Sequence, residues 1–132
     1  MHTALTGKEL HLLEARLRRR AQELCHEIDE RNKRAADERF TRVASEVPDL
    51  EDASLADVVV DTTNAAIKRD ADESHEIDAA LGRIAAGSYG VCLRCGSPIP
   101  LQRLQAVPMA RYDERCQRLE EHERGLAWPP KL

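Results

Sequence analysis

The sequence predicts a mainly α-helical protein, built as a long antiparallel two-helix coiled-coil hairpin with a small globular base and a short C-terminal helix. Three observations predict the hairpin. Apolar residues recur at the α-helical spacing, and neither proline nor glycine interrupts residues 8–47. One Phe, two Tyr and one Trp supply too little bulky apolar surface for a thick core, so each long helix needs one partner rather than a surrounding domain.

The first long helix is expected to run from residue 8 to residue 47. Thr6 can cap its N-terminus, and Glu9 lies three residues later, as in a capping box. The five steps from Leu10 to Ile28 cover 18 residues, a mean spacing of 3.6. The apolar residues of this stripe are Leu10, Leu13, Leu17, Ala21, Leu24 and Ile28. Such a narrow stripe favours a coiled-coil contact with a second helix.

The second long helix is expected from about residue 54 to residue 86. Pro48 ends the first helix, and Asp52 or Ser54 can cap the second. Gly87 supplies the C-terminal stop. The residues expected to face the partner helix are Leu55, Val59, Ile67, Ile77, Leu81 and Ile84. A short turn between two long amphipathic helices forces them into an antiparallel hairpin.

The chain is expected to divide into a hairpin, residues 1–87 with its tip at 48–54, and a base, residues 88–132. Charge is uneven along it, with a net charge of +1 for residues 1–47 (10 Lys/Arg, 9 Asp/Glu), −7 for 48–87 (3 and 10) and +2 for the base (7 and 5). Such an acidic middle repels phosphate backbones, which argues against a sequence-specific DNA binder.

The cysteines predict a zinc-ribbon-like base. Cys92 and Cys95 form a Cys-x-x-Cys knuckle, and Gly96 lets the backbone turn tightly after it. After seventeen residues the chain continues as Asp113-x-x-Cys116, which is the spacing of a four-ligand zinc site with one ligand changed. A carboxylate oxygen can ligate zinc, and positions i and i+3 of a helix share one face.

Several interpretations of this site stay open. Asp113 can be the fourth zinc ligand, or it can be merely the N-cap of the last helix. The site can also have lost zinc and be held by packing, or another side chain can replace Asp113 as a ligand. The best substitute ligand is His122, whereas Cys25 lies far up the hairpin and is expected to fill the coiled-coil seam. The apolar residues available to pack the base are Val91, Ile99, Leu101, Leu104, Val107, Met109 and Leu119.

The chain is expected to be cytoplasmic, because no apolar run is long enough to span a membrane and no apolar signal segment opens the sequence. In that setting four cysteines indicate metal ligands or free thiols before disulfides. The chain is also expected to be a monomer. Two classes of regulator compete for the function, namely a zinc-ribbon DNA-binding protein and a thiol redox sensor that uses Cys92 and Cys95. Pro98 and Pro100 do not suit the helix that follows a thioredoxin-like pair. No enzyme is expected, since no nucleophile and base set is visible.

Two segments resemble the DksA/TraR family of bacterial transcription factors. "YGVCLRCGSPIPLQRLQAVPMARYDERCQ" is similar to the family's zinc-finger region, and "PDLEDAS" to its acidic coiled-coil tip, Asp-x-x-Asp-x-Ala/Ser. The knuckle alone is a weak signal, but knuckle, tip and one intervening helix of about 33 residues together are specific. The resemblance covers about residues 6–126.

This resemblance implies a protein that binds RNA polymerase and inserts its coiled coil into the secondary channel, where the tip acts near the active site to modulate initiation. The tip residues would be Asp49 and Asp52, with Ser54 at the small-residue position. The zinc ligands would be Cys92, Cys95 and Cys116, with Asp113 in place of the remaining cysteine.

The resemblance also implies joint action with the alarmone ppGpp, but this chain departs from the family there. It has Glu76, Val107 and Gln117 at positions where better-known members place basic residues, and retains Arg103. Lost positive charge weakens the binding of a polyanion, so dependence on ppGpp is doubtful.

Overall fold

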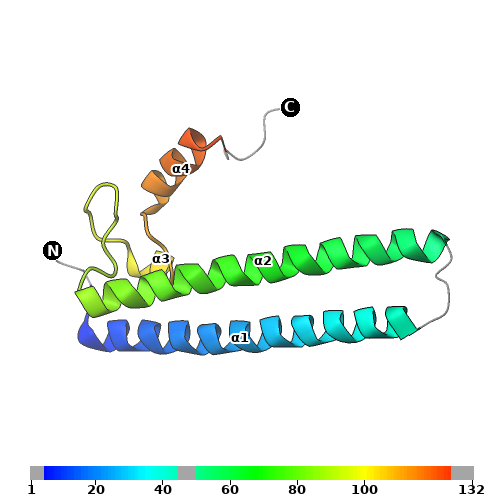
Figure 1. Ribbon diagram of the computed structural model, residues 1–132. Helices are drawn as coiled ribbons and strands as arrows, with labels where there is room; N and C mark the ends of the chain where they lie inside the picture. Colours follow the sequence, from blue (N-terminus) through cyan, green and yellow to red (C-terminus); the bar gives the residue numbers. More distant parts are fainter. Residues whose placement is uncertain (1–4, 45–49, 126–132) are drawn as a thin grey trace. The chain divides into compact units, whose positions relative to one another are not determined.

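The computed structural model describes the backbone of residues 5–44 and 50–125, and the side chains of 5–41 and 64–125. These residues form four helices, α1 (Gly7–Ala44), α2 (Leu50–Ala86), α3 (Leu101–Ala106) and α4 (Glu114–Glu123) (Figure 1). Over the described residues the only β-structure is an isolated bridge between Val91 and Pro98. The predicted mainly helical fold is therefore confirmed. Contacts divide the chain into two compact units, one of residues 1–19 with 76–132 and the other of residues 20–75.

The start of α1 is set by the predicted capping box. The Glu9 backbone N–H donates to Thr6 Oγ1 at 3.1 Å, and the Thr6 backbone N–H donates to Glu9 Oε1 at 3.0 Å. These reciprocal bonds satisfy amide groups that have no partner inside the helix. The helix is described as far as Ala44, and the predicted last three residues lie outside the described range.

The bounds of α2 correct the predicted start of the second long helix. This helix begins at Leu50, four residues earlier than expected, so Asp52 and Ser54 lie within its first turns and do not cap it. Its end agrees with the prediction: Gly87 has φ of +78°, and its N–H donates to Ile84 O at 3.1 Å while the Ser88 N–H donates to Arg83 O at 2.9 Å. This is the Schellman pattern, in which glycine adopts the left-handed conformation at little cost.

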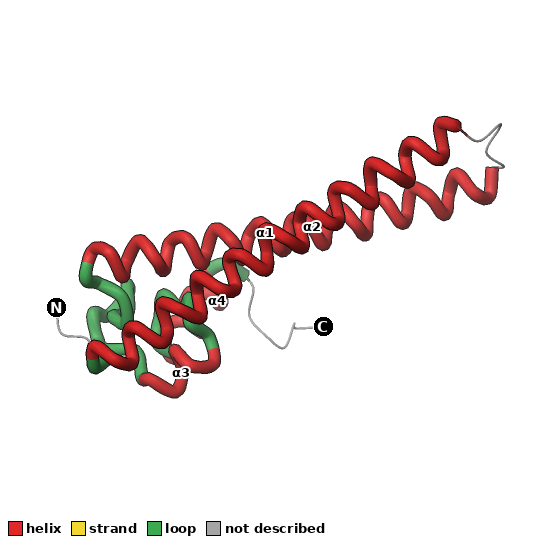
Figure 2. Tube along the Cα trace, turned by 90° about the horizontal axis from the view of Figure 1, so that it is seen from below, coloured by secondary structure: helices red, strands yellow, loops and turns green. Residues whose placement is uncertain are grey.

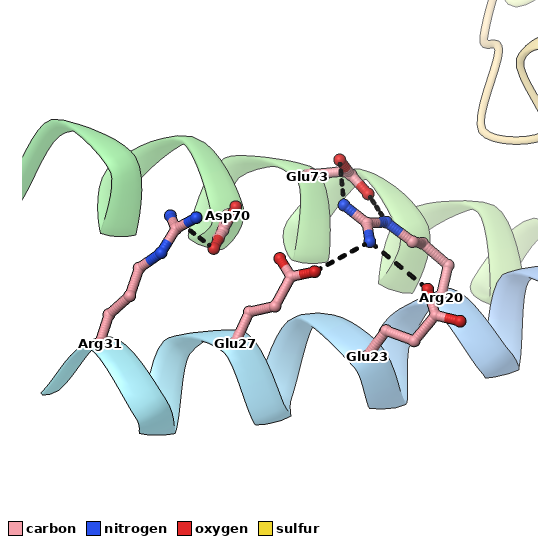
Figure 3. A network of polar contacts seen from close by, with 6 residues as sticks. All are labelled: Arg20, Glu23, Glu27, Arg31, Asp70 and Glu73. Atoms are coloured by element: carbon pink, nitrogen blue, oxygen red, sulfur yellow. Dashed lines mark hydrogen bonds and ion pairs between the residues drawn. The ribbon is translucent and has the colours of Figure 1, made fainter. Parts of the chain in front are cut away.

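In the unit of residues 20–75, ion pairs between side chains link α1 to α2 (Figure 3). Arg20 Nη2 donates to Glu73 Oε1 at 3.2 Å, which raises the pKa of the guanidinium above its usual value. Further along, Arg31 Nη1 lies 2.9 Å from Asp70 Oδ2; the charges pair at that distance, although the geometry does not make a hydrogen bond. Residues 20 and 31 of one helix thus meet 73 and 70 of the other, which is antiparallel. Within this unit, Leu24 is the only fully covered side chain among those described.

The other unit contains most of the described apolar core, and Figure 2 shows α3 among the loops of this unit. Its buried side chains are Leu13, Leu17, Ile77, Ala80, Tyr89, Val91, Cys92, Ile99, Leu104, Ala110 and Cys116. The Tyr89 hydroxyl donates to Pro108 O at 2.7 Å, and burial raises the pKa of this phenol to about 12. A buried phenol whose proton is held by a carbonyl fixes the loop before α4.

Three predicted packing residues lie elsewhere than expected. Val107 and Leu119 are exposed, because Val107 ends α3 and Leu119 lines an open cleft between α3 and α4. Cys25 is exposed and does not fill the seam, since it directly follows the buried Leu24 and therefore lies about 100° around the helix from the contact. Within the described residues, every helix is too short or too polar to cross a lipid bilayer.

Candidate metal centre

The knuckle is a tight hairpin that brings Cys92 and Cys95 to one side. The Cys92 N–H donates to Ser97 O at 2.8 Å, and the Ile99 N–H donates to Gly90 O at 2.8 Å, which closes the hairpin around the Val91–Pro98 bridge. The Gly96 N–H returns to Cys92 O at 2.9 Å. Gly96 has φ of +74°, a value that side-chain-bearing residues rarely adopt, so this position favours glycine.

The opposite half of the site is the first turn of α4. Asp113 is the N-cap, and its Oδ1 accepts a hydrogen bond from the Cys116 N–H at 2.7 Å. Its second oxygen, Oδ2, lies 3.2 Å from Cys95 Sγ, which donates to it. One carboxylate therefore caps the helix with one oxygen and faces the thiols with the other. The cap and ligand interpretations of Asp113 are compatible.

Four side chains converge here in the described part of the chain. One donor atom each from Cys92, Cys95, Asp113 and Cys116 lies within 4.8 Å of the other three. Around zinc at 2.3 Å, tetrahedral sulfur ligands stand about 3.8 Å apart, so the group needs only a small contraction to close on an ion. Three thiolates and a carboxylate are a donor set that zinc accepts. The residues fit a metal, and zinc would tie the knuckle to α4.

The predicted substitute ligand does not join this group. His122 is exposed in the last turn of α4, where it lines the cleft that this helix forms with α3. The cleft has a volume of about 1000 Å³.

The cysteines differ in how readily they lose a proton. Burial raises the pKa of Cys92, but hydrogen bonds from the backbone around Cys95, Asp113 and Arg94 outweigh it and lower the pKa to about 7. Burial and the neighbouring Asp113 carboxylate raise the pKa of Cys116 to about 12. The pKa of Asp113 itself is lowered by the Cys116 N–H and then by Cys95. Because zinc binds thiolates, its binding must displace a proton from Cys116.

The sequence pointed to all four members of this group but missed one neighbour. Arg94, between the two knuckle cysteines, pairs with Glu120 and Glu123 of α4. The available signal was the placement of these acidic residues three apart, on one face of the last helix. The predicted tip is not tested, because Asp49 and the side chains of Asp52 and Ser54 lie outside what the structure describes.

Known proteins resemble this chain in sequence. Residues 87–122 match the model of the prokaryotic DksA/TraR C4-type zinc finger. An uncharacterized protein of Aquifex aeolicus is 48% identical over 54 residues, which are 41% of this chain and 37% of that protein. The RNA polymerase-binding transcription factor DksA of Caulobacter vibrioides is 42% identical over 77 residues, 54% of this chain and 53% of that protein. The matches thus span about half, or less, of these curated relatives.

Solved structures extend the likeness to nearly the whole chain. Transcription factor DksA2 from Pseudomonas aeruginosa superposes with a TM-score of 0.74 at 27% identity, over 89% of this chain and 88% of that one. The RNA polymerase binding protein and transcriptional regulator Dks from Chlamydia trachomatis gives a TM-score of 0.51 at 25% identity, over 92% and 95%. These matches confirm the predicted resemblance and the helical fold.

Proposed function

On the premise that residues 87–122 are a zinc finger of the DksA/TraR family, we propose that the chain is a bacterial transcription regulator that binds RNA polymerase. The observation that carries the proposal is the superposition on transcription factor DksA2 over 89% of the chain, because it includes the long helices as well as the finger. The finger alone would fit many zinc proteins. A partner of this kind places the protein in the cytoplasm.

The proposed mode of action is that the α1–α2 hairpin enters the secondary channel of polymerase and modulates initiation there. A pair of helices is slender, so it can enter a pore that excludes a globular domain. Asp49 and Asp52 would act near the active site, with Ser54 beside them, because paired carboxylates bind basic side chains or a metal ion held by the partner. The start of α2 at Leu50 is compatible with this role, since it puts Asp52 on a helical backbone.

The charges in and beside the base support weak or absent dependence on ppGpp. Glu76 of α2 forms an ion pair with Arg111 at 3.3 Å, so the Arg111 guanidinium is already neutralised by a carboxylate. Arg103 donates its Nε to the Tyr112 backbone carbonyl at 2.9 Å. Val107 is exposed and uncharged, and Gln117 is bonded within α4. A polyanion would therefore find few uncommitted cations among these residues.

The metal centre is proposed to be structural. Cys92, Cys95, Asp113 and Cys116 would supply all four ligands, which leaves no open position for a substrate on a tetrahedral ion. Its role would be to hold α4 against the knuckle, so that the base presents a fixed surface to polymerase.

Binding to purified core RNA polymerase tests the proposal. The wild-type chain should be retained by immobilised core enzyme, and the Asp49→Asn/Asp52→Asn variant should bind equally well but lose its effect on transcription in vitro. The matched control is Asp37→Asn/Asp29→Asn, which removes the same charge from exposed positions of α1. No binding by the wild type would overturn the proposal, and equal loss of binding and effect in the tip variant would overturn the role given to the tip.

A further inference from the structure

Arg94 stands between the two knuckle cysteines, yet its side chain is bound to α4. Its Nη1 donates to Glu120 Oε1 at 3.1 Å and to Glu123 Oε2 at 3.1 Å, and its Nη2 donates to Glu123 Oε1 at 2.6 Å. The guanidinium thus engages both oxygens of Glu123 and one of Glu120. Forked, charge-assisted bonds of this kind fix direction as well as distance.

The position of these acids along α4 gives the contact a second effect. Glu120 and Glu123 follow Cys116 by four and seven residues, so they lie about 6 and 10 Å further along the helix axis. A bound metal would hold the knuckle to the N-terminal turn of α4, and Arg94 holds it to the C-terminal half. A helix attached at one end can pivot, whereas attachment at two points fixes its orientation.

Arg94 and Glu120 are partly shielded from water, with side-chain exposures of 30% and 23%, whereas Glu123 is 58% exposed. Shielding strengthens an ion pair relative to the fully exposed kind. A second pair on α4 provides the contrast. Arg118 lies 2.5 Å from Glu114, with exposures of 74% and 70%, and ties the helix only to itself.

We propose that Arg94 is a positioning residue for the metal centre. It holds α4 against the knuckle whether or not a metal is bound, and so keeps Asp113 and Cys116 opposite Cys92 and Cys95. Such preorganisation raises the affinity of the site for zinc, because less ordering remains to be paid for on binding. This gain offsets part of the zinc affinity that the site loses because Asp113 stands where a C4-type finger has one of its four cysteines.

The experiment compares Arg94→Met with the control Arg118→Met, which removes one positive charge from an exposed ion pair within α4. Two quantities are measured in the full chain: amide hydrogen exchange of residues 114–123 after removal of metal by a chelator, and zinc affinity by competition with a chromophoric chelator. Arg94→Met should speed exchange in α4 and weaken zinc binding, each by about five- to tenfold. Arg118→Met should change both by less than about twofold, and Arg94→Lys, which can reach one carboxylate but cannot fork, should be intermediate.

Unchanged exchange in Arg94→Met, or equal effects in Arg94→Met and Arg118→Met, would overturn the proposal. If the wild type takes up no zinc, the amide hydrogen exchange of α4 alone tests the proposal. If Arg94→Met fails to fold, Glu123→Gln is measured in its place. Wild-type hydrogen exchange of α4 in that variant would refute the proposal that Arg94 holds α4 against the knuckle. Neither readout involves RNA polymerase, so the result stands apart from the proposed function.

Discussion

Asp113 does two things with its two oxygens, and substitutions can separate them. Oδ1 caps α4 through the Cys116 N–H at 2.7 Å, while Oδ2 lies 3.2 Å from Cys95 Sγ among the metal donors. Asparagine keeps the cap and loses the anionic ligand; cysteine supplies a ligand and loses the cap; alanine loses both. Capping by Asp or Asn is worth about 1 kcal/mol relative to Ala.

For a chain of this size, about 1 kcal/mol corresponds to a change of about 4 °C in melting temperature. With metal removed, Asp113→Ala and Asp113→Cys should therefore melt about 4 °C below the wild type, and Asp113→Asn within about 1 °C of it. With zinc, the order of affinity should be Cys, then wild type, then Asn and Ala. The two lower variants should lose more than about tenfold, since even partners outside the ligand shell cost that much.

The assays are melting followed by circular dichroism, with and without chelator, and elemental analysis of the purified proteins. Equal and stoichiometric zinc in the wild type and in Asp113→Ala would refute the ligand role. A metal-free Asp113→Asn that melts as low as the metal-free Asp113→Ala would refute the cap. Failure of all variants, including Asp113→Cys, to take up zinc would mean that packing alone holds the base.

Three further predictions follow from burial and charge. Zinc affinity should fall more steeply with decreasing pH below pH 7 than above it, by about one further factor of ten per pH unit. The reason is that the pKa of the Cys92 thiol is lowered to about 7, so below pH 7 this thiol holds a proton that zinc must displace. A competition titration that gives an equal slope on both sides of pH 7 would contradict this. Leu24→Ala should lower the free energy of unfolding by about 2–3 kcal/mol in urea denaturation, since Leu24 is fully buried, and a loss under about 1 kcal/mol would contradict the described contact. Cys25→Ser should stay within about 0.5 kcal/mol of wild type in the same assay, because this side chain is exposed, and a larger loss would restore the seam position first predicted for it.

Local signals in the sequence predict the structure where a short-range physical rule applies. The Thr6–Glu9 capping box and the stop at Gly87 depend on residues within four positions, and both are confirmed by hydrogen bonds. The pairing of the knuckle with Asp113 and Cys116 was also predicted, because ligand spacing in a zinc ribbon is nearly fixed.

The predictions that were wrong concern the burial of side chains that depends on tertiary contacts rather than on local sequence. Cys25 and Leu24 are neighbours, and only the rotation of α1 against α2 determines which of them is buried. Leu119 is apolar but lines a cleft, because the number of apolar residues in the base does not say how many of them find a partner. Arg94 was missed for the same reason, since its partners lie 26 and 29 residues away.

The two compact units are held by different kinds of interaction, and this predicts a gradient of stability along the chain. In the unit of residues 20–75, the described side chains include one buried residue, Leu24, and ion pairs such as Arg20–Glu73. Partly exposed ion pairs contribute about 1 kcal/mol or less, and salt screens them. In the other unit the contact between α1 and α2 is backed by a cluster of buried apolar side chains that includes Tyr89 and Leu104.

Local opening should therefore be easier in residues 20–41 and 64–75 than in the parts of the same helices at 7–19 and 76–86. Amide hydrogen exchange followed by mass spectrometry should give protection at least about tenfold lower in the first pair of segments, and raising the salt concentration should widen the difference. The segments 7–19 and 76–86, which are packed by buried apolar side chains, should be much less sensitive to salt. Uniform protection along both helices would contradict the reasoning, because it would mean that the ion pairs and the single buried leucine among the described residues of 20–75 hold the helices together as firmly as the apolar cluster does.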